Sequence, residues 1–534
     1  MPAGIMSRRD FLKIMGAAGG SGAIWSALKA WGMMIPTMQN PPRLEGRGDG
    51  TRVIILGAGL GGLAAGYELM QYGYDVTILE AQNRSGGRNW SVRQGTELTE
   101  HGGERQVCEY DEGHYANLGP WRIPYHHQSV LYYCKLLNVP MEVFVNYQEA
   151  SWVFVEGDHG PLSGRPIRVR ELHADMRGYT SELLAKVAQN SQLDQDLDDE
   201  GLEQLIDYLV AEGDLDSDSL VYDQSARRGY AVPPGALDQP GEESSPYGLD
   251  ELLPYAAEIL QAHADYLGSV ADHNYQMTMF QPVGGMDQIG QAFSSVLEDR
   301  INLQAEVREI RQTTSGVRVV YRNLETGDDS EITGDYIICN IPLPVLINIP
   351  ADFSMDMLEA IRRITYMPTG KIGLQFNRRF WEEDDQIYGG VTRSNITELG
   401  DIAYPNYGFF GQKGVIQGYY NFQMDAIRVS HMSLQGRIEF AMQHGSKIHP
   451  QYRESFENAF SVAWHRFPYQ LGGWAVYNDH TRERYYPRII EPDGRIYLVG
   501  DHASYLSGWQ AGAIESAWKQ IERLHAREMQ RRGG

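Results

Sequence analysis

The sequence predicts an α/β protein that begins with a strand, a glycine-rich turn, a helix and a second strand, and three observations support this. Residues 53–56 form a continuous apolar run, as in a strand buried on both faces of a parallel sheet. The segment GAGLGG follows at 57–62. A second apolar run, 76–79, ends on Glu80, about 20 residues beyond the glycines. This order predicts a Rossmann-like unit that binds a dinucleotide.

Each glycine of the turn has an expected task. Gly57 can make the tight turn, Gly59 lets the backbone approach a pyrophosphate, and Gly62 lets the helix pack on the strand. A helix is expected over 60–72, and its N-terminus offers free N–H groups and a positive dipole end to phosphates. Glu80 can accept hydrogen bonds from both ribose hydroxyls, which disfavours a 2′-phosphate. The turn therefore favours FAD or NAD over NADP.

The residues after this acid distinguish the two dinucleotides. Residues 80–88 read EAQNRSGGR, in which two arginines and two glycines can wrap a pyrophosphate and a flavin edge. The run resembles the E-A-x-x-R-x-G-G-R signature of the flavin monoamine oxidase superfamily, which implies a glutathione-reductase-type FAD domain with Ala81 and Arg88 among the cofactor contacts. No second G-x-G-x-x-G occurs in the chain. We therefore expect one FAD and no nicotinamide site, so electrons pass to oxygen or another diffusible acceptor.

Length and charge limit the classes of function. A chain of 534 residues can form two or three domains with substantial cores. Its net charge of −24 disfavours nucleic acid and anionic membranes as partners. Cys108, Cys134 and Cys339 fit no metal spacing, so no metal is expected. Cys339 is expected in the core. A disulfide between Cys108 and Cys134 is possible in an oxidising compartment, but the sequence does not require it.

The N-terminal 36 residues resemble a twin-arginine export signal. Arg8 and Arg9 precede Phe-Leu-Lys and a weakly apolar, glycine-rich run. The alternatives are a basic tail or a membrane anchor over 14–36, which Lys29 and the glycines disfavour. We expect a folded protein exported to the periplasm or secreted, with no stable membrane span after processing. Residues 37–50 are expected to form a linker.

A second resemblance concerns the substrate. Residues 114–124, HYANLGPWRIP, resemble a segment of the L-amino acid oxidases in which the arginine, here Arg122, clamps the substrate carboxylate. A guanidinium fork matches a carboxylate in geometry and charge. The alternative is a surface charge or an internal salt bridge.

Three later segments resemble the same family. Val307, in QAEV, is expected to contact the adenine, and Lys371, in TGKIGL, to reach flavin N5 through a water. Tyr419, in GVIQGY, is expected to make a second contact with the substrate carboxylate. Tyr420 is adjacent, and in a strand only one of the two tyrosines can face the pocket.

The C-terminal third carries the last motifs. Trp474 stands where animal monoamine oxidases have the flavin-linking cysteine, which predicts non-covalent FAD and a tryptophan in the pocket wall or in the core. Residues 496–501, IYLVGD, and 507–513, SGWQAGA, resemble the family's C-terminal FAD motif. In the amino acid oxidases the pair that corresponds to Gly508 and Trp509 lies over the substrate α-carbon. A final helix is expected over 511–527, with its N-terminus towards the flavin.

Together these motifs give a complete site prediction. The predicted catalytic residues are Lys371, Arg122, Tyr419 and Trp509. The predicted substrate contacts are Arg122, Tyr419, Trp474, Gly508 and Trp509. The predicted cofactor contacts are Gly57, Gly59, Gly62, Glu80, Ala81, Arg88, Gly119, Pro120, Trp121, Arg122, Val307, Gly500, Asp501, Gly508, Trp509 and Ala511.

The expected domain order alternates between two domains and one insertion. A mixed-sheet substrate domain takes residues 96–165 and 369–484, and FAD-binding parts take 51–95, 276–368 and 485–527. Residues 166–275 show apolar residues at helical spacing over 181–193, 202–211 and 249–267, which predicts an inserted helical domain. His273, near its end, is expected to be structural.

The resemblance implies an FAD-dependent L-amino acid oxidase, which converts an L-amino acid, oxygen and water to a 2-oxo acid, ammonia and hydrogen peroxide. The alternatives are an amine oxidase, an amino acid 2-monooxygenase, or an exported flavin-binding protein without catalysis. A homodimer or higher homo-oligomer is expected.

Overall fold

The computed structural model describes residues 40–190, 197–235, 239–262 and 273–533. The predicted export signal lies outside these residues. Within them, no helix combines the length and the apolar character that crossing a membrane requires.

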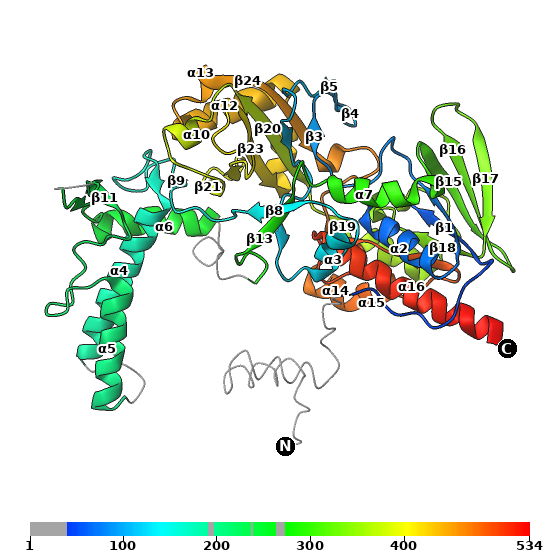
Figure 1. Ribbon diagram of the computed structural model, residues 1–534, viewed down its shortest axis with the longest axis horizontal. Coiled ribbons are helices and arrows are strands. Elements are labelled where there is room, and N and C mark those ends of the chain that lie inside the picture. The colour runs from blue at the N-terminus through cyan, green and yellow to red at the C-terminus, as the bar shows by residue number, and fades with distance from the viewer. Residues whose placement is uncertain (1–39, 191–196, 236–238, 263–272, 534) are drawn as a thin grey trace.

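A five-stranded parallel sheet forms the nucleotide-binding half of the molecule (Figure 1). Its order is β14 (Ile301–Asn302), β2 (Asp75–Leu79), β1 (Arg52–Leu56), β18 (Tyr336–Cys339) and β26 (Ile496–Leu498). The predicted first strand, turn and helix appear as β1, residues 57–59 and α2 (Leu60–Gln71). Gly73 follows α2 with φ of +83°, the left-handed conformation that glycine adopts without strain. The predicted α/β fold class is confirmed.

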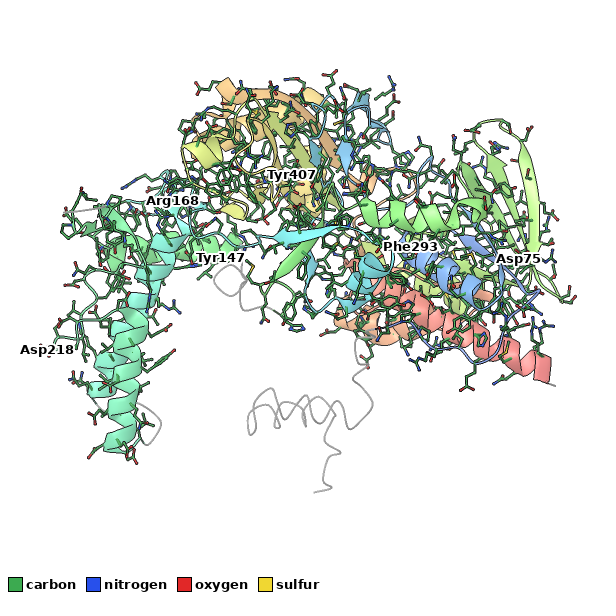
Figure 2. The ribbon with its side chains drawn as sticks, viewed as in Figure 1. Asp75, Tyr147, Arg168, Asp218, Phe293 and Tyr407 are labelled. Carbon is green, nitrogen blue, oxygen red and sulfur yellow. The ribbon has the colours of Figure 1, made fainter. Side chains whose placement is uncertain are left out.

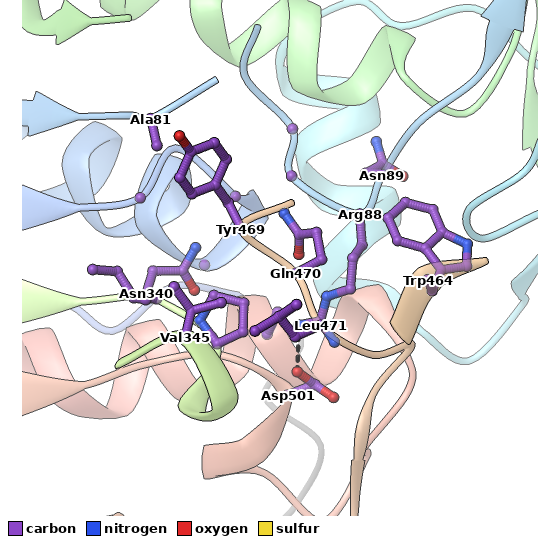
Figure 3. A pocket seen from close by; sticks show the side chains of 18 of the residues that line it. Ala81, Arg88, Asn89, Asn340, Val345, Trp464, Tyr469, Gln470, Leu471 and Asp501 are labelled. Carbon is purple, nitrogen blue, oxygen red and sulfur yellow. Dashed lines mark hydrogen bonds and ion pairs between the residues drawn. The ribbon is translucent and has the colours of Figure 1, made fainter. Parts of the chain in front are cut away.

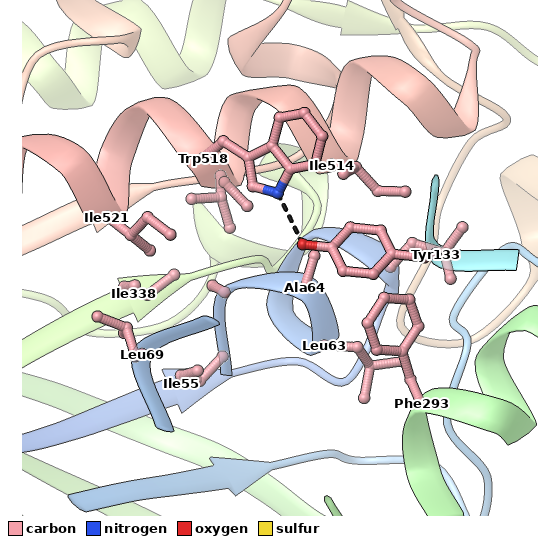
Figure 4. Close-up of a cluster of buried hydrophobic side chains, with 14 of the residues drawn as sticks. Ile55, Leu63, Ala64, Leu69, Tyr133, Phe293, Ile338, Ile514, Trp518 and Ile521 are labelled. Atoms are coloured by element: carbon pink, nitrogen blue, oxygen red, sulfur yellow. Dashed lines mark hydrogen bonds between the residues drawn. The ribbon is translucent and has the colours of Figure 1, made fainter. Parts of the chain in front are cut away.

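Helices and a second sheet cover the two faces of this sheet. One face packs against α2, α3 (Gln128–Leu136), α7 (Gln288–Leu297) and α16 (Gln510–Gly533). Figure 4 shows this core, in which Trp518 Nε1 donates to the hydroxyl of Tyr133 at 2.7 Å. That hydroxyl donates to the buried carboxylate of Glu68, also at 2.7 Å. The other face contacts the antiparallel sheet β15 (Ala305–Gln312), β16 (Val317–Asn323) and β17 (Asp329–Gly334), with α9 (Met355–Arg363).

A seven-stranded mixed sheet forms the second half. Its neighbouring strands β20 (Thr369–Phe376) and β23 (Gly414–Phe422) are antiparallel, and β20 is buried along its whole length. The other strands are β10 (Ile167–Arg168), β9 (Trp152–Phe154), β21 (Val391–Ser394), β22 (Asp401–Ala403) and β24 (Phe456–Ala463). Helix α12 (Leu434–Ile448) packs on it. A small sheet of β7 (Ile123–Pro124), β13 (Met279–Pro282) and β8 (Met141–Phe144) lies beside it.

Helices α4 (Val169–Gln189) and α5 (Asp199–Gly213) form an arm that projects from the body (Figure 1). Helix α6 (Leu249–Ala262) lies at its base. The expected start of the first helix at residue 181 is wrong. The helix begins at Val169, where the side chain of Glu171 accepts from the backbone N–H of Arg168 and caps the first turn. The guanidinium of Arg168, labelled in Figure 2, lies over the ring of Trp152 at the base of the arm. The proposed domain boundaries stay predictions.

Candidate functional site

A cavity of about 580 Å³ lies where the two halves meet, and segments from the whole chain line it (Figure 3). Eleven of the predicted cofactor contacts line this cavity: Gly57, Gly59, Glu80, Ala81, Arg88, Gly119, Pro120, Val307, Asp501, Gly508 and Trp509. Lys371 and Trp474 also line it. The cavity therefore gathers residues that are more than 400 positions apart in sequence.

The glycine-rich turn is built as a close-packed wall of this cavity. Gly57 has φ of +97°. A Cβ on Gly59 would lie 2.6 Å from the side-chain amide of Asn340, and a Cβ on Gly62 would lie 2.1 Å from the Gly57 carbonyl oxygen. Gly62 thus makes the helix–strand contact expected of it without lining the cavity. Because Gly57 and Gly59 line the cavity and have no side chain, the turn leaves room for a phosphate there.

Glu80 directly follows β2 and lines the cavity. It accepts hydrogen bonds from the backbone N–H groups of Ala58 at 2.7 Å and Gln82 at 2.9 Å. Burial raises the pKa of this carboxyl, and these two hydrogen bonds and Arg84 act in the opposite direction. A carboxylate has four lone-pair sites, so two can still accept the hydroxyls of a ribose.

Arg88 and Asp501, which both line the cavity, form an ion pair. Arg88 Nη2 lies 2.5 Å from Asp501 Oδ1, and Arg88 Nη1 donates to the carbonyl of Gly473 at 2.7 Å (Figure 3). Burial alone would raise the pKa of Asp501, but the Arg88 guanidinium outweighs burial and holds this pKa below its ordinary value. Asp501 also accepts from the backbone N–H of Ala475 at 2.9 Å, so the pair is fixed from both sides.

The expected cofactor contacts Gly500 and Ala511 do not line the cavity. Gly500, with φ of +137°, turns its N–H to the hydroxyl of Ser516 at 2.9 Å. Ala511 is buried in the first turn of α16, from which Gln510 and Ala513 face the cavity instead. Helix α16 begins at Gln510, one residue earlier than expected.

Lys371 is almost completely buried in the cavity wall. Its Nζ donates to the carbonyl oxygen of Gly119 at 2.6 Å and lies 4.2 Å from the ring centroid of Tyr420. Burial, and secondly the charge of Arg122, hold the pKa of Lys371 well below its ordinary value. The fixed amine is therefore biased towards its neutral form, which can exchange a proton with a neighbouring water.

The choice of Tyr419 over Tyr420 was wrong. Tyr420 is directly opposite Lys371 in the β20–β23 register, so the two side chains share the face that lines the cavity. Tyr419 is opposite Ile372 and points into the core, where its hydroxyl lies 2.9 Å from Ser461 Oγ. No hydrogen bond joins the Tyr420 hydroxyl to another residue in the described part of the chain. Tyr420 is therefore the tyrosine that a ligand can reach.

Arg122 lies close enough to Lys371 and Tyr420 for its charge to lower the pKa of both, but it does not itself line the cavity. Its Nη1 donates to Asn146 Oδ1 at 2.5 Å, while its Nε is buried without a hydrogen-bond partner. Its Cζ lies 4.9 Å from the ring centroid of Trp121, which was expected to contact the cofactor but packs here instead. Among the residues that the structure describes, Arg122 forms no ion pair. Burial lowers the pKa of its guanidinium.

The other pocket residues form an aromatic wall. A Cβ on Gly508, whose φ is +82°, would lie 3.1 Å from Cγ of Trp474, so the tryptophan ring packs flat against this glycine. The ring of Trp509 is perpendicular to that of His127, and the two ring centroids lie 4.9 Å apart. The ring centroid of His273 lies 3.9 Å from that of His126, with the two rings tilted by 31°. His273 is not among the residues that line the cavity.

The cysteines take no part in the site. All three are buried free thiols, so the Cys108–Cys134 disulfide does not form, and none lines the cavity. Over the described ranges, no cluster of acidic, histidine or cysteine side chains could hold a metal ion.

The residues fit a flavin dinucleotide. The cavity has a side-chain-free turn for phosphates, a buried acid at the end of the second strand, and a buried ion pair at the other end. Each of these features would meet a different part of a long, anionic cofactor.

Comparisons with known proteins agree with this geometry. The family of flavin containing amine oxidoreductases matches residues 60–524. The chain is 27% identical over 494 residues to the putative L-amino-acid oxidase YobN of Bacillus subtilis (strain 168), covering 87% of this chain and 92% of that protein. It is 26% identical over 488 residues to an L-amino-acid oxidase of Siganus canaliculatus, covering 90% and 86%.

Among solved structures, the fold resembles putrescine oxidase. A triple mutant of that enzyme aligns with a TM-score of 0.59 at 18% identity, covering 90% of this chain and 99% of that chain. The wild-type enzyme bound to putrescine aligns with a TM-score of 0.57 at 17% identity, with the same coverage. This similarity shows the shared fold. With a family match that spans most of its length, the chain belongs to the flavin-containing amine oxidoreductases.

Proposed function

We propose that this flavin-dependent oxidoreductase deaminates L-amino acids oxidatively, giving 2-oxo acids, ammonia and hydrogen peroxide. The observation that carries the proposal is the partly buried guanidinium of Arg122, which has no carboxylate partner within the described ranges and lies near Lys371 and Tyr420.

The charge balance around Arg122 favours an anionic ligand. A buried cation without a counter-ion is costly. Asn146 supplies one neutral acceptor, and Asp401, the acid that acts on the Arg122 pKa, lies 3.5 Å from a second arginine, Arg393. The α-carboxylate of an amino acid would supply the missing charge in the bidentate geometry that a guanidinium prefers.

The cofactor is proposed to be non-covalent FAD. The glycine-rich turn and Glu80 would hold its phosphates and ribose, and Arg88 with Asp501 would hold its other end. Trp474 lines the cavity where a linking cysteine would stand, and the three cysteines lie elsewhere. The flavin supplies hydride acceptance from the α-carbon and transfer of the electrons to oxygen.

The protein's own residues then supply orientation. Arg122 and Tyr420 would fix the carboxylate, and Gly508 and Trp509 would border the α-carbon. Holding both ends of a small substrate turns a collision into an oriented, nearly intramolecular step. Lys371, anchored by the carbonyl of Gly119, would hold a water and exchange a proton with it.

Three alternatives remain distinct. An amine oxidase would use Arg122 only structurally, and the putrescine oxidase neighbours support this reading at the level of the fold alone. An amino acid 2-monooxygenase would use the same clamp but release an amide. A non-catalytic flavin carrier would leave the buried Lys371 without a role.

Export by the twin-arginine route and a homodimer or higher homo-oligomer are also proposed.

Anaerobic reduction of the purified yellow protein separates these readings. L-phenylalanine and L-leucine should bleach the flavin, whereas phenethylamine and isoamylamine should do so far more slowly. Equal bleaching by the amines would support an amine oxidase, and a protein that stays yellow with every substrate would support a carrier. Analysis of the aerobic product as a 2-oxo acid or an amide separates oxidase from monooxygenase.

A further inference from the structure

One aromatic side chain at the site has no role in the description so far. Tyr275 lies in the segment that leads from the helical region into β13. Its ring centroid is 4.6 Å from Cζ of Arg122. With Trp121 at 4.9 Å, the guanidinium contacts two aromatic rings.

Tyr275 also reaches the opposite end of the proposed substrate site. Its ring centroid lies 6.0 Å from that of Trp509, at an interplanar angle of 52°. Trp509 is itself supported by the perpendicular ring of His127. Tyr275 is therefore the ring that connects the carboxylate end of the site to the wall beside Gly508.

The ring contacts have a consequence for the geometry of the clamp. An arginine side chain has several rotatable bonds, and ordering them costs conformational entropy when a ligand binds. A guanidinium grips a carboxylate with two parallel hydrogen bonds only if its plane is fixed. Aromatic rings fix this plane by cation–π contact and leave the N–H edge free. Asn146 already accepts from Nη1, so a carboxylate would have to use the remaining N–H groups of Arg122.

We infer that Tyr275 is a positioning residue for the Arg122 clamp and, through it, a determinant of selection for substrates that carry a carboxylate. This inference rests on the proposed function, because the clamp has a task only if the substrate is an acid.

The test compares Tyr275→Leu, which removes the ring, with Tyr275→Phe, which keeps it. Benzoate, a carboxylate without an oxidisable amine, is titrated into each oxidised holoenzyme and followed by the flavin absorbance. Tyr275→Leu should raise the Kd for benzoate and the KM for L-amino acids by about 3- to 30-fold, the range of one cation–π contact. Its kcat, and its rates with the decarboxylated amines, should change little. Tyr275→Phe should keep wild-type values.

A matched control and a second variant complete the experiment. Tyr247→Leu removes a ring that lies 4.5 Å from Arg228 in the helical region, away from the cavity, and should leave benzoate binding unchanged. If Tyr275→Leu does not fold, Tyr275→Met removes the ring but leaves a longer, adaptable side chain to fill the gap, and it should show the same losses.

Two results would overturn the inference: unchanged benzoate affinity in Tyr275→Leu and Tyr275→Met, or a loss in Tyr275→Phe as large as that in Tyr275→Leu. A wild-type protein that binds benzoate and prefers acids, combined with either result, removes only the role of Tyr275. A wild-type protein that neither binds benzoate nor prefers acids removes the proposed function as well.

Discussion

Two neighbouring tyrosines give a sharp test of which face of β23 meets the substrate. Tyr420→Phe removes a hydroxyl that is directly opposite Lys371 in the strand register. A hydrogen bond from this hydroxyl to a carboxylate would contribute about 1.5–3 kcal/mol, so kcat/KM for L-amino acids should fall roughly 10- to 150-fold. Because the decarboxylated amine lacks that acceptor, its rate should change less than about 3-fold.

Tyr419→Phe is the matched control. It removes the 2.9 Å hydrogen bond to Ser461 in the core, where burial raises the pKa of Tyr419 to about 12. Its expected effect is about 1 kcal/mol of unfolding free energy, with kcat/KM unchanged. The assays are steady-state peroxide production and denaturant unfolding of both variants. A large kcat/KM loss in Tyr419→Phe with none in Tyr420→Phe would refute the assignment of faces.

Three further predictions concern the cofactor, export and acid stability. Because Trp474 lines the cavity and no cysteine does, acid precipitation should release the yellow colour into the supernatant, and a yellow pellet would mean a covalent flavin. Replacing both Arg8 and Arg9 by Lys should trap active enzyme inside the cell, so unchanged secretion, measured as extracellular activity, would reject the export signal. Burial lowers the pKa of His502 from 6.5 to about 4, so the unfolded state takes up this proton first as the pH falls. Stability should therefore decrease between pH 6.5 and 4, by up to about 3 kcal/mol from His502. Unfolding by denaturant at pH 7.0 and 4.5 measures this, and a pH-independent free energy would contradict it.

Local motifs could be predicted from the sequence because their geometry is local. The turn at 57–62 and the acid that ends β2 depend on residues that are adjacent in the chain. The sequence also allowed the prediction that Arg88 and Asp501 lie in the same site, because both stand in motifs that resemble parts of one cofactor site. The structure shows them as an ion pair.

The orientation of β23 could not be predicted for a physical reason. The strand is buried on both faces, so hydrophobic alternation does not tell them apart. In addition, the register shifts between Ile372 and Gly373, which face Tyr419 and Gln417, so Gly418 is an extra residue in a β-bulge. A bulge redirects the side chains that follow it. That shift turns Tyr420 towards Lys371 and Tyr419 into the core.

Tyr275 and Asn146 were missed because tertiary structure alone brings them to Arg122. Asn146 lies 24 residues after Arg122 in sequence, and Tyr275 follows the whole helical region. No spacing rule connects positions so far apart. A loop residue beside a candidate clamp becomes visible only when the chain is folded.

The central claim is that Arg122 selects amino acids over amines, and the most direct measurement is kcat/KM for an L-amino acid and for its decarboxylated amine in Arg122→Ala. Loss of the guanidinium leaves a buried carboxylate unpaired, at a cost of roughly 3–5 kcal/mol, so the value for the amino acid should fall roughly 10²- to 10³-fold or more. The value for the amine should change little, and flavin content should stay near that of the wild type, because Arg122 does not line the cofactor cavity. An equal fall for both substrates, or loss of the flavin, would contradict the claim and make Arg122 a structural residue.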